Sequence, residues 1–141
     1  MDTKEEATVL IREAKEELER ALRESPIRDW VAVTRSAQLA IEKAAKAVIS
    51  CFAAYEWSHD PSQQLRKLIQ RGLVDGSFEE MALYAEQASP WHGASTYGER
   101  KRGRRRSPSE VCTQEVAQDL LQKASKSVNK ASEFLGNLYR K

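Results

Sequence analysis

The stretch from Arg28 to Trp57 constrains the fold of this 141-residue chain more than any other part of the sequence. Apolar residues recur there at steps of three and four, which is the spacing of one face of an α-helix. They are Val33, Ala37, Ala40, Ile41, Ala44, Val48, Cys51, Phe52 and Tyr55. Val31, Leu39 and Ile49 add apolar groups on a second side, and so wide an apolar surface contacts more than one neighbouring helix or another subunit. The pattern predicts a long central helix whose many alanines allow other helices to approach closely.

The same period recurs in four other segments, two of them long and two short: residues 3–24, 113–139, 60–72 and 77–88. Ser25-Pro26 and Ser89-Pro90 end two of them, because proline lacks a backbone N–H and disfavours helical geometry in the residue before it. No alternation of apolar and polar residues typical of a β-strand persists. We therefore predict a single all-α domain over residues 1–141, an antiparallel bundle of three long helices plus one or two short ones.

The composition excludes several classes of protein. No window approaches the ~20 consecutive apolar residues that a membrane helix needs. The opening MDTKEE lacks the basic and apolar regions of a secretory signal. Cys51 and Cys112 have no Cys or His at metal-ligand spacing, so we expect reduced, buried thiols. These observations favour a cytoplasmic protein that does not associate with membranes.

Positive charge is concentrated in one short segment. Residues Glu99 to Arg106 include six basic side chains and one acidic one, a charge of +5. The rest of the chain has 17 basic and 20 acidic residues, a charge of −3. The basic segment lies within a stretch from Ser89 to Pro108 that has no helical period, so we predict a long basic loop before the last helix.

A dense group of cations favours an anionic partner, and arginine binds phosphate oxygens through two N–H groups at once. The candidate nucleotide- or RNA-binding residues are Tyr97, which could stack on a base together with Trp91, and the cations Arg100, Lys101, Arg102, Arg104, Arg105 and Arg106. Such binding would release counterions and weaken strongly with salt. Two other interpretations stay open: a solvated, disordered loop, or a loop that docks on the acidic body of a dimer partner.

The sequence offers little for catalysis. Its two histidines, His59 and His92, are both predicted in loops, and neither stands three or four residues from another His or a Cys. Spacing therefore predicts no metal site, and no glycine pattern typical of a phosphate-binding loop is present. We expect His59 to hydrogen-bond the start of the next helix and His92 to make a surface or interface contact. We predict no catalytic residue, metal or cofactor.

The central stretch from Arg35 to Val48, RSAQLAIEKAAKAV, resembles the helix of HEPN domains (higher eukaryotes and prokaryotes nucleotide-binding), which typically reads A-Q-x-A-x-E-K-x-x-K-A. Two further segments resemble the family in the right order. One is Ser58-His59-Asp60, followed by a leucine-bearing short helix. The other is Tyr97 with the downstream arginines and Ser107 to Val111 before a long last helix.

The resemblance implies an antiparallel helical bundle, commonly a homodimer, and members of the family often act beside a minimal nucleotidyltransferase partner. Several members belong to toxin–antitoxin or defence systems. Nuclease members carry an Arg-polar-x-x-x-His motif, and here no arginine lies four to seven residues before His59 or His92. The resemblance is therefore to the non-nuclease type.

Lys43 and Lys46 in the central stretch have two interpretations. Glu42 and Lys46 stand four residues apart, which is typical of a surface ion pair. Alternatively, Lys43 and Lys46 line a polar groove with the loop arginines and bind phosphate.

Three hypotheses of function follow. The first is a non-catalytic HEPN-type module that binds nucleotide, RNA or a partner protein. The second is a toxin-like ribonuclease with a non-standard site at His59 or His92. The third is a helical bundle that only recruits another protein.

Overall fold

The computed structural model describes residues 3–140, and most of them are helical. The three long helices are α1 (Thr3–Glu24), α2 (Trp30–Ser50) and α7 (Gln114–Leu138). Between α2 and α7 lie α3 (Ser62–Gln70), the 3₁₀ turn η1 (Gly76–Phe78), α4 (Glu79–Ala88), α5 (Trp91–Tyr97), β1 (Glu99–Lys101), β2 (Arg104–Arg106) and α6 (Pro108–Val111). Within residues 3–140, no helix has the length and apolar character needed to cross a membrane. The predicted all-α bundle is confirmed.

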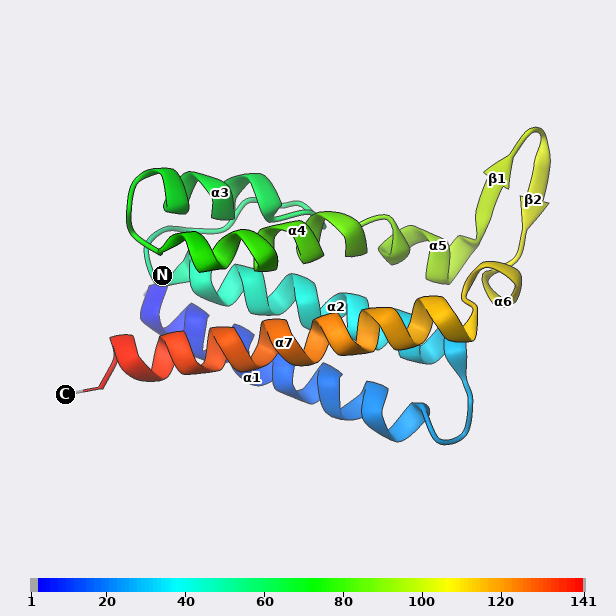
Figure 1. The fold of residues 1–141 in the computed structure, drawn as a ribbon, viewed down its shortest axis with the longest axis horizontal. Helices are drawn as coiled ribbons and strands as arrows, with labels where there is room; N and C mark the ends of the chain where they lie inside the picture. The colour runs from blue at the N-terminus through cyan, green and yellow to red at the C-terminus, as the bar shows by residue number, and fades with distance from the viewer. Residues whose placement is uncertain (1–2, 141) are drawn as a thin grey trace.

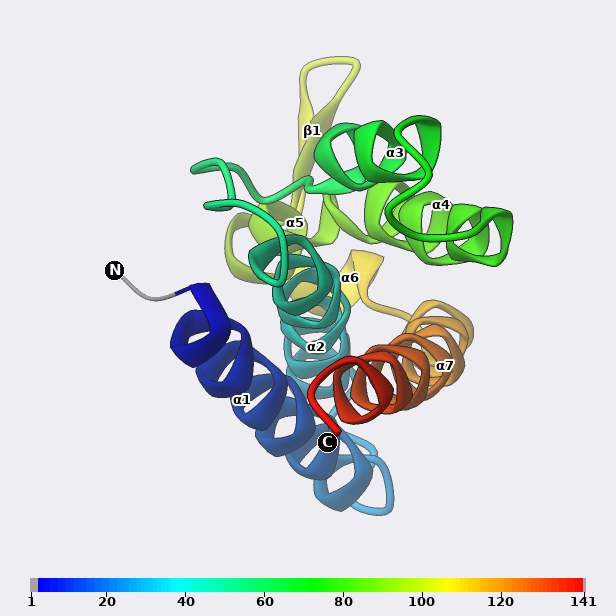
Figure 2. The same cartoon turned by 90° about the vertical axis from the view of Figure 1, so that its left-hand side faces the viewer.

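Helix α2 lies at the centre of the bundle, as predicted (Figures 1 and 2). It packs against α1 and α7 along most of its length, and against α3, α4 and α5 on another side. Helix α1 runs antiparallel to α2 and α7, while the shorter elements return the chain to the end where α7 begins (Figure 1). The hairpin of β1 and β2 therefore lies at one end of the bundle, beside the start of α7.

Small side chains make this arrangement possible. Ala37, Ala40 and Ala44 on α2 are fully buried, and so are Ala14 on α1 and Ala124 on α7. Because an alanine side chain is small, the helix backbones approach closely, while Ile41 and Val48 fill the remaining core.

Asp29 caps the N-terminus of α2, since its side chain accepts a hydrogen bond from the backbone N–H of Ala32, at 3.1 Å.

The predicted central helix is too long, because α2 ends at Ser50 and not near Trp57. Phe52 and Tyr55 still pack against the core, but from an irregular segment, so the apolar period continues beyond the helix. The side chain of Gln64 stabilises this segment. It donates to the carbonyl of Ala54 and accepts from the N–H of Glu56, both at 2.8 Å.

The predicted long loop from Ser89 to Pro108 is wrong in its conformation. The segment folds into α5, a two-stranded antiparallel hairpin and α6. Helix α5 has only seven residues, which is too few to show a clear apolar period. The two strands have three residues each, all of them charged, so no alternation of apolar and polar residues marks them.

Candidate functional site

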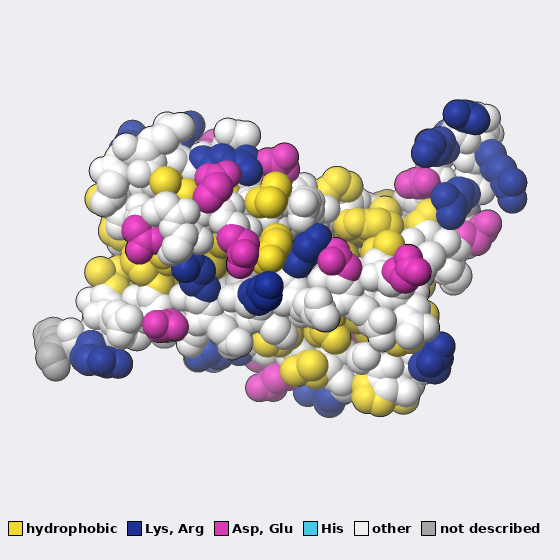
Figure 3. Space-filling model, viewed as in Figure 1, with side chains coloured by type: hydrophobic (Ala, Val, Ile, Leu, Met, Phe, Trp, Pro, Cys, Tyr) yellow, Lys and Arg dark blue, Asp and Glu magenta, His cyan; other side chains and the backbone are white. Residues whose placement is uncertain are grey.

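The basic segment forms a hairpin that projects from the end of the helical body (Figures 1 and 3). We call residues 99–106 the arginine hairpin. Its turn residues, Arg102 and Gly103, have φ angles of 54° and 77°, as a two-residue type I′ turn requires. The register pairs Glu99 with Arg106, Arg100 with Arg105 and Lys101 with Arg104. The segment therefore has a defined conformation that holds its cations out in solvent.

Cations face one another across the arginine hairpin. Like charges directly opposite each other destabilise a pair of strands, and two of the three cross-strand pairs are of this kind. Residues opposite each other share a face, so Arg100 and Arg105 lie together on one face of the hairpin. On the other, an open hollow is lined by Lys101, Arg102, Arg104 and Arg106. A bound anion would relieve the repulsion on either face.

Interactions at its base fix the hairpin to the body. Arg106 pairs with Glu99 at 3.4 Å, and Arg105 donates a hydrogen bond to the carbonyl of Tyr97 at 3.0 Å. Below them, Glu110 accepts from the backbone N–H of Ser107 at 3.0 Å, and hydrogen bonds from Ser107 lower the pKa of the Glu110 carboxyl. Arg105 and Arg106 thus stabilise the hairpin. Arg105 stays exposed, as do the other four cations, and only Arg106 is half-buried.

Gly98 is the residue on which the direction of the hairpin depends, because its φ of +74° and ψ of −154° are favourable only for glycine. A Cβ at this position would lie 1.9 Å from the carbonyl oxygen of Arg106. We expect Gly98→Ala to lower hydrogen-exchange protection of the hairpin amides roughly 10- to 100-fold, as a local cost of about 1–3 kcal/mol implies, while the helical core stays protected.

The matched control is Gly103→Ala, because Gly103 also has a positive φ but its added Cβ would meet nothing within 4 Å. We expect a smaller loss of protection in this variant. Equal losses in the two variants would show that the clash with Arg106 does not set the conformation of the hairpin base.

A second group of polar residues lies on one face of α2. Arg35, Gln38, Glu42 and Lys46 follow one another at steps of three and four, and we call this group the polar face of α2. Gln38 and Lys46 donate hydrogen bonds to the two oxygens of Glu42, to Oε1 at 3.0 Å and to Oε2 at 2.9 Å. Arg35 donates to the carbonyl of Ser95 at 2.9 Å and so ties α5 to α2.

Glu42 is charged although it is buried. Burial by itself would raise the pKa of the Glu42 carboxyl, but hydrogen bonds from Lys46 and Gln38 and the charge of Lys46 outweigh burial and lower it below its ordinary value. Lys46 also lies over the ring of Tyr55, 4.9 Å from its centre. The pair is therefore a buried ion pair, with side-chain exposures of 10% for Lys46 and 9% for Glu42, and the predicted surface pair is wrong.

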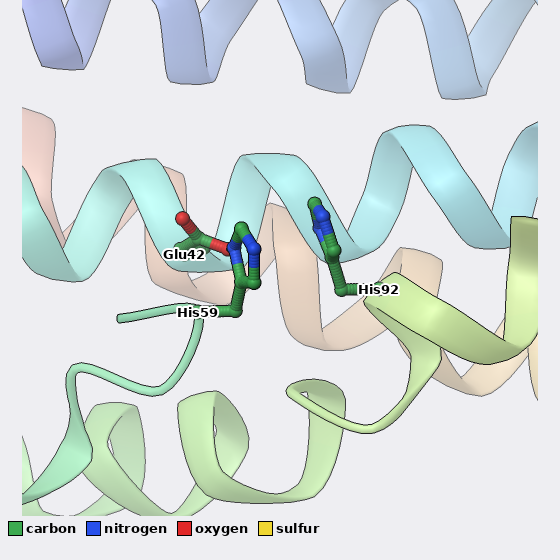
Figure 4. Close-up of side chains that lie close together, drawn as sticks. All are labelled: Glu42, His59 and His92. Atoms are coloured by element: carbon green, nitrogen blue, oxygen red, sulfur yellow. The ribbon is translucent and has the colours of Figure 1, made fainter. Parts of the chain in front are cut away.

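His59 and His92 meet beside Glu42 (Figure 4). His59 comes from the segment before α3 and places its Nδ1 3.3 Å from Oε1 of Glu42. His92 comes from the first turn of α5 and places its Nδ1 3.2 Å from Oε1 of Gln38. The two rings stack with their centres 3.5 Å apart and an interplanar angle of 17°. Partial burial, together with the neighbouring charge of His59, lowers the pKa of His92.

The role predicted for His59 from its position in the sequence is wrong. Asp60, not His59, hydrogen-bonds the start of the following helix, because its Oδ1 accepts from the N–H of Ser62 at 3.0 Å. His92 lies partly buried against the polar face of α2. Together with Glu42, the histidines supply imidazole and carboxylate groups at one place, which is suited to proton transfer or to metal binding.

The structure does not bring Lys43 and Lys46 to the arginines. The Nζ of Lys43 lies 3.6 Å from Oε1 of Glu13 on α1, and Lys46 forms its ion pair with Glu42. Lys46 is three turns of α2 beyond Arg35, the residue that contacts α5, which is about 16 Å along the axis. The predicted groove of lysines and arginines is therefore absent among the described residues.

The two aromatic candidates lie in different environments. Tyr97 is 73% exposed at the base of the hairpin, where it can stack on a base. Trp91 is partly buried and packs against the core, so it is poorly placed to stack on a base.

The residues that the sequence analysis missed as functional candidates are Gln38 and Glu42. The available signal was their place in the motif of α2 together with the Ser58-His59-Asp60 segment.

Comparison with known proteins gives one match. A family model described as the HEPN domain matches residues 7–135. That range begins in α1 and ends in α7, so it includes the polar face of α2, both histidines and the arginine hairpin. Searches of curated proteins and of solved structures found no match.

Proposed function

The chain belongs to the HEPN domain family, and from this premise we propose that it is an RNA-binding module whose arginine hairpin holds the phosphate backbone. One observation carries the proposal. Residues 99–106 have a charge of +5 and project into solvent from a body whose charge is −3. A body of opposite charge disfavours general adhesion to polyanions, so binding should be confined to the hairpin.

The hairpin suits phosphate better than base edges. Arginine side chains on both of its faces reach solvent, and each can bind two oxygens of one phosphate. Contacts with phosphate carry no sequence information, so we expect binding to tolerate many sequences. Exposed Tyr97 adds a stacking surface, which favours single-stranded RNA because its bases are free to stack.

Salt dependence tests this proposal. Five exposed cations, Arg100, Lys101, Arg102, Arg104 and Arg105, are available to phosphates. For a labelled single-stranded RNA, fluorescence anisotropy should therefore give a slope of log affinity against log salt of about −3.5. The same measurement with ATP separates a nucleotide site from an RNA site, because one nucleotide cannot engage both faces. A slope near zero, or binding of ATP alone, would contradict the proposal.

The proposal includes a homodimer and a minimal nucleotidyltransferase partner in a toxin–antitoxin-like pair, as the family relationship suggests. Apolar side chains available for such contacts are exposed on the body, among them Leu22, Ile27 and Trp57. In this arrangement the hairpin binds RNA and the bundle recruits the partner. Light scattering on the purified chain, alone and with a candidate partner, measures both associations.

Cleavage of RNA is a second candidate function, favoured by the stacking of His59 on His92 beside Glu42. One imidazole would take the proton of a ribose 2′-hydroxyl, whose oxygen then attacks the adjacent phosphorus. The other would protonate the departing 5′-oxygen, leaving a 2′,3′-cyclic phosphate. Helix α5 carries His92 and leads directly into the arginine hairpin, so bound RNA would pass close to the pair.

If the chain cleaves RNA in this way, His59→Ala and His92→Ala should each reduce cleavage roughly 100-fold or more in the presence of EDTA. Affinity for RNA should stay unchanged in both variants, because neither histidine lies in the hairpin. Gel analysis of a labelled RNA measures the rate. Full cleavage by both variants would exclude this candidate, and absence of cleavage by the unmodified chain would leave the binding function alone.

A further inference from the structure

Glu42, His59 and His92 place one ligand atom each within 4.8 Å of one another. They come from three separate parts of the chain, namely α2, the segment before α3, and α5 (Figure 4). Imidazole nitrogen and carboxylate oxygen are the donors that Zn²⁺ and similar divalent ions prefer when no thiolate is present. The set of two histidines and one glutamate also occurs in zinc sites that keep a coordination position open.

The pair of His59 and Glu42 already has the separation that two ligands of such an ion have. Bonds from zinc to nitrogen and oxygen are about 2.0–2.2 Å long, so neighbouring ligands of a tetrahedral ion are about 3.3 Å apart. The distance from His59 Nδ1 to Glu42 Oε1 is 3.3 Å. The side chain of His59 is 59% exposed, so it has the freedom to adjust and an ion can reach it from solvent.

The polar face of α2 fixes the proton on His92. The amide nitrogen of Gln38 donates to Glu42, so the oxygen of the same amide faces Nδ1 of His92 and can only accept. His92 therefore carries its proton on Nδ1 and offers the lone pair of Nε2 as a ligand. Metal-binding histidines commonly donate their other ring N–H to an oxygen acceptor in this way.

Lys46 performs a related task for Glu42. Its ammonium group holds Oε2 at 2.9 Å and leaves Oε1 on the side of the histidines. This arrangement orients the carboxylate to bind an ion through a single oxygen.

We propose that Glu42, His59 and His92 bind one divalent transition-metal ion of the Zn²⁺ class, through Oε1, Nδ1 and Nε2 respectively. His92 must turn out of its stack on His59 so that both rings point at the ion. Solvent beside the exposed His59 leaves a fourth position for water. The site shares no residue with the arginine hairpin, so RNA binding and metal binding can fail independently.

Titration of the full chain with Zn²⁺ by calorimetry, and with Co²⁺ by visible absorption, tests the site. We expect one ion per chain and a visible cobalt spectrum typical of low coordination number. His59→Ala and His92→Ala should each weaken binding by at least the roughly 100-fold that loss of an outer-shell partner can cost. Long-range ¹H–¹⁵N spectra of the imidazoles should assign ligation to Nδ1 of His59 and Nε2 of His92.

The controls address the other possible ligands and the fold. Cys51 and Cys112 are both free, so a Cys51→Ser/Cys112→Ser variant should bind Zn²⁺ as the unmodified chain does. His59 is exposed, so His59→Ala should keep the helical circular dichroism and thermal midpoint of the unmodified chain. Absence of saturable one-to-one binding, or binding that persists in either histidine variant or disappears in the cysteine variant, would overturn the proposal.

Discussion

Replacement of Arg100, Lys101 and Arg104 by glutamine should weaken binding of single-stranded RNA roughly 100-fold at ~0.1 M salt, because three phosphate contacts and their released counterions are lost. The three residues are exposed on the strands of the arginine hairpin. Arg105 and Arg106 stay in place because they fix the hairpin to the body. The slope of log affinity against log salt should fall from about −3.5 to about −1.4.

The matched control removes the same charge from the body. Arg12, Lys15 and Arg23 are exposed on α1, and the triple glutamine variant at these positions also lowers the net charge by three. We expect its affinity for RNA to change only a few-fold. If both triple variants lose affinity equally, net charge determines binding and the hairpin has no special role.

The second large effect concerns stability. Glu42→Leu should lower the free energy of unfolding by roughly 3 kcal/mol, since it leaves the buried ammonium group of Lys46 without a counter-charge. For a chain of this size the thermal midpoint should fall by roughly 10 °C. Glu42→Leu/Lys46→Met should recover at least half of the loss, because apolar side chains of similar volume often replace a buried ion pair without cost.

The same pair predicts how stability depends on pH. Glu42 binds a proton less readily in the folded chain than in the unfolded one, where its pKa is near 4.5. Its contribution is therefore fully present above that value and is lost as the pH falls through the lower pKa of the folded state. Urea denaturation at several pH values measures this, and the double variant should show a weaker dependence below pH ~4.5. An unchanged dependence would mean that other carboxyls control acid stability.

The long helices could be predicted because each buries one continuous apolar face, and that face has a period that the sequence displays directly. In α2 the apolar period is longer than the helix. Phe52 and Tyr55 continue the apolar period into a segment that is not helical. The period follows which side chains are buried, whereas the end of the helix is determined by where its backbone hydrogen bonds stop. This segment is stabilised by hydrogen bonds from the side chain of Gln64. Because Gln64 lies in α3, the sequence of the segment itself gives no signal of these bonds.

The two parts of the site differ in how far the sequence predicts them. The cations of residues 99–106 are contiguous, so the sequence displays the basic segment directly. It does not display the hairpin conformation, because that depends on positive φ angles at Gly98, Arg102 and Gly103. His59 and His92 are far apart in the sequence and meet only because α5 folds back onto α2. No spacing rule predicts such a pair.

The central claim is that RNA binds to the arginine hairpin, and a titration of the ¹⁵N-labelled 16.0 kDa chain with a short single-stranded RNA tests it most directly. The largest changes in amide and arginine side-chain signals should fall within residues 97–107, with little change in α1. Large changes confined to α1, or to the body around α7, with the hairpin signals unmoved would contradict it.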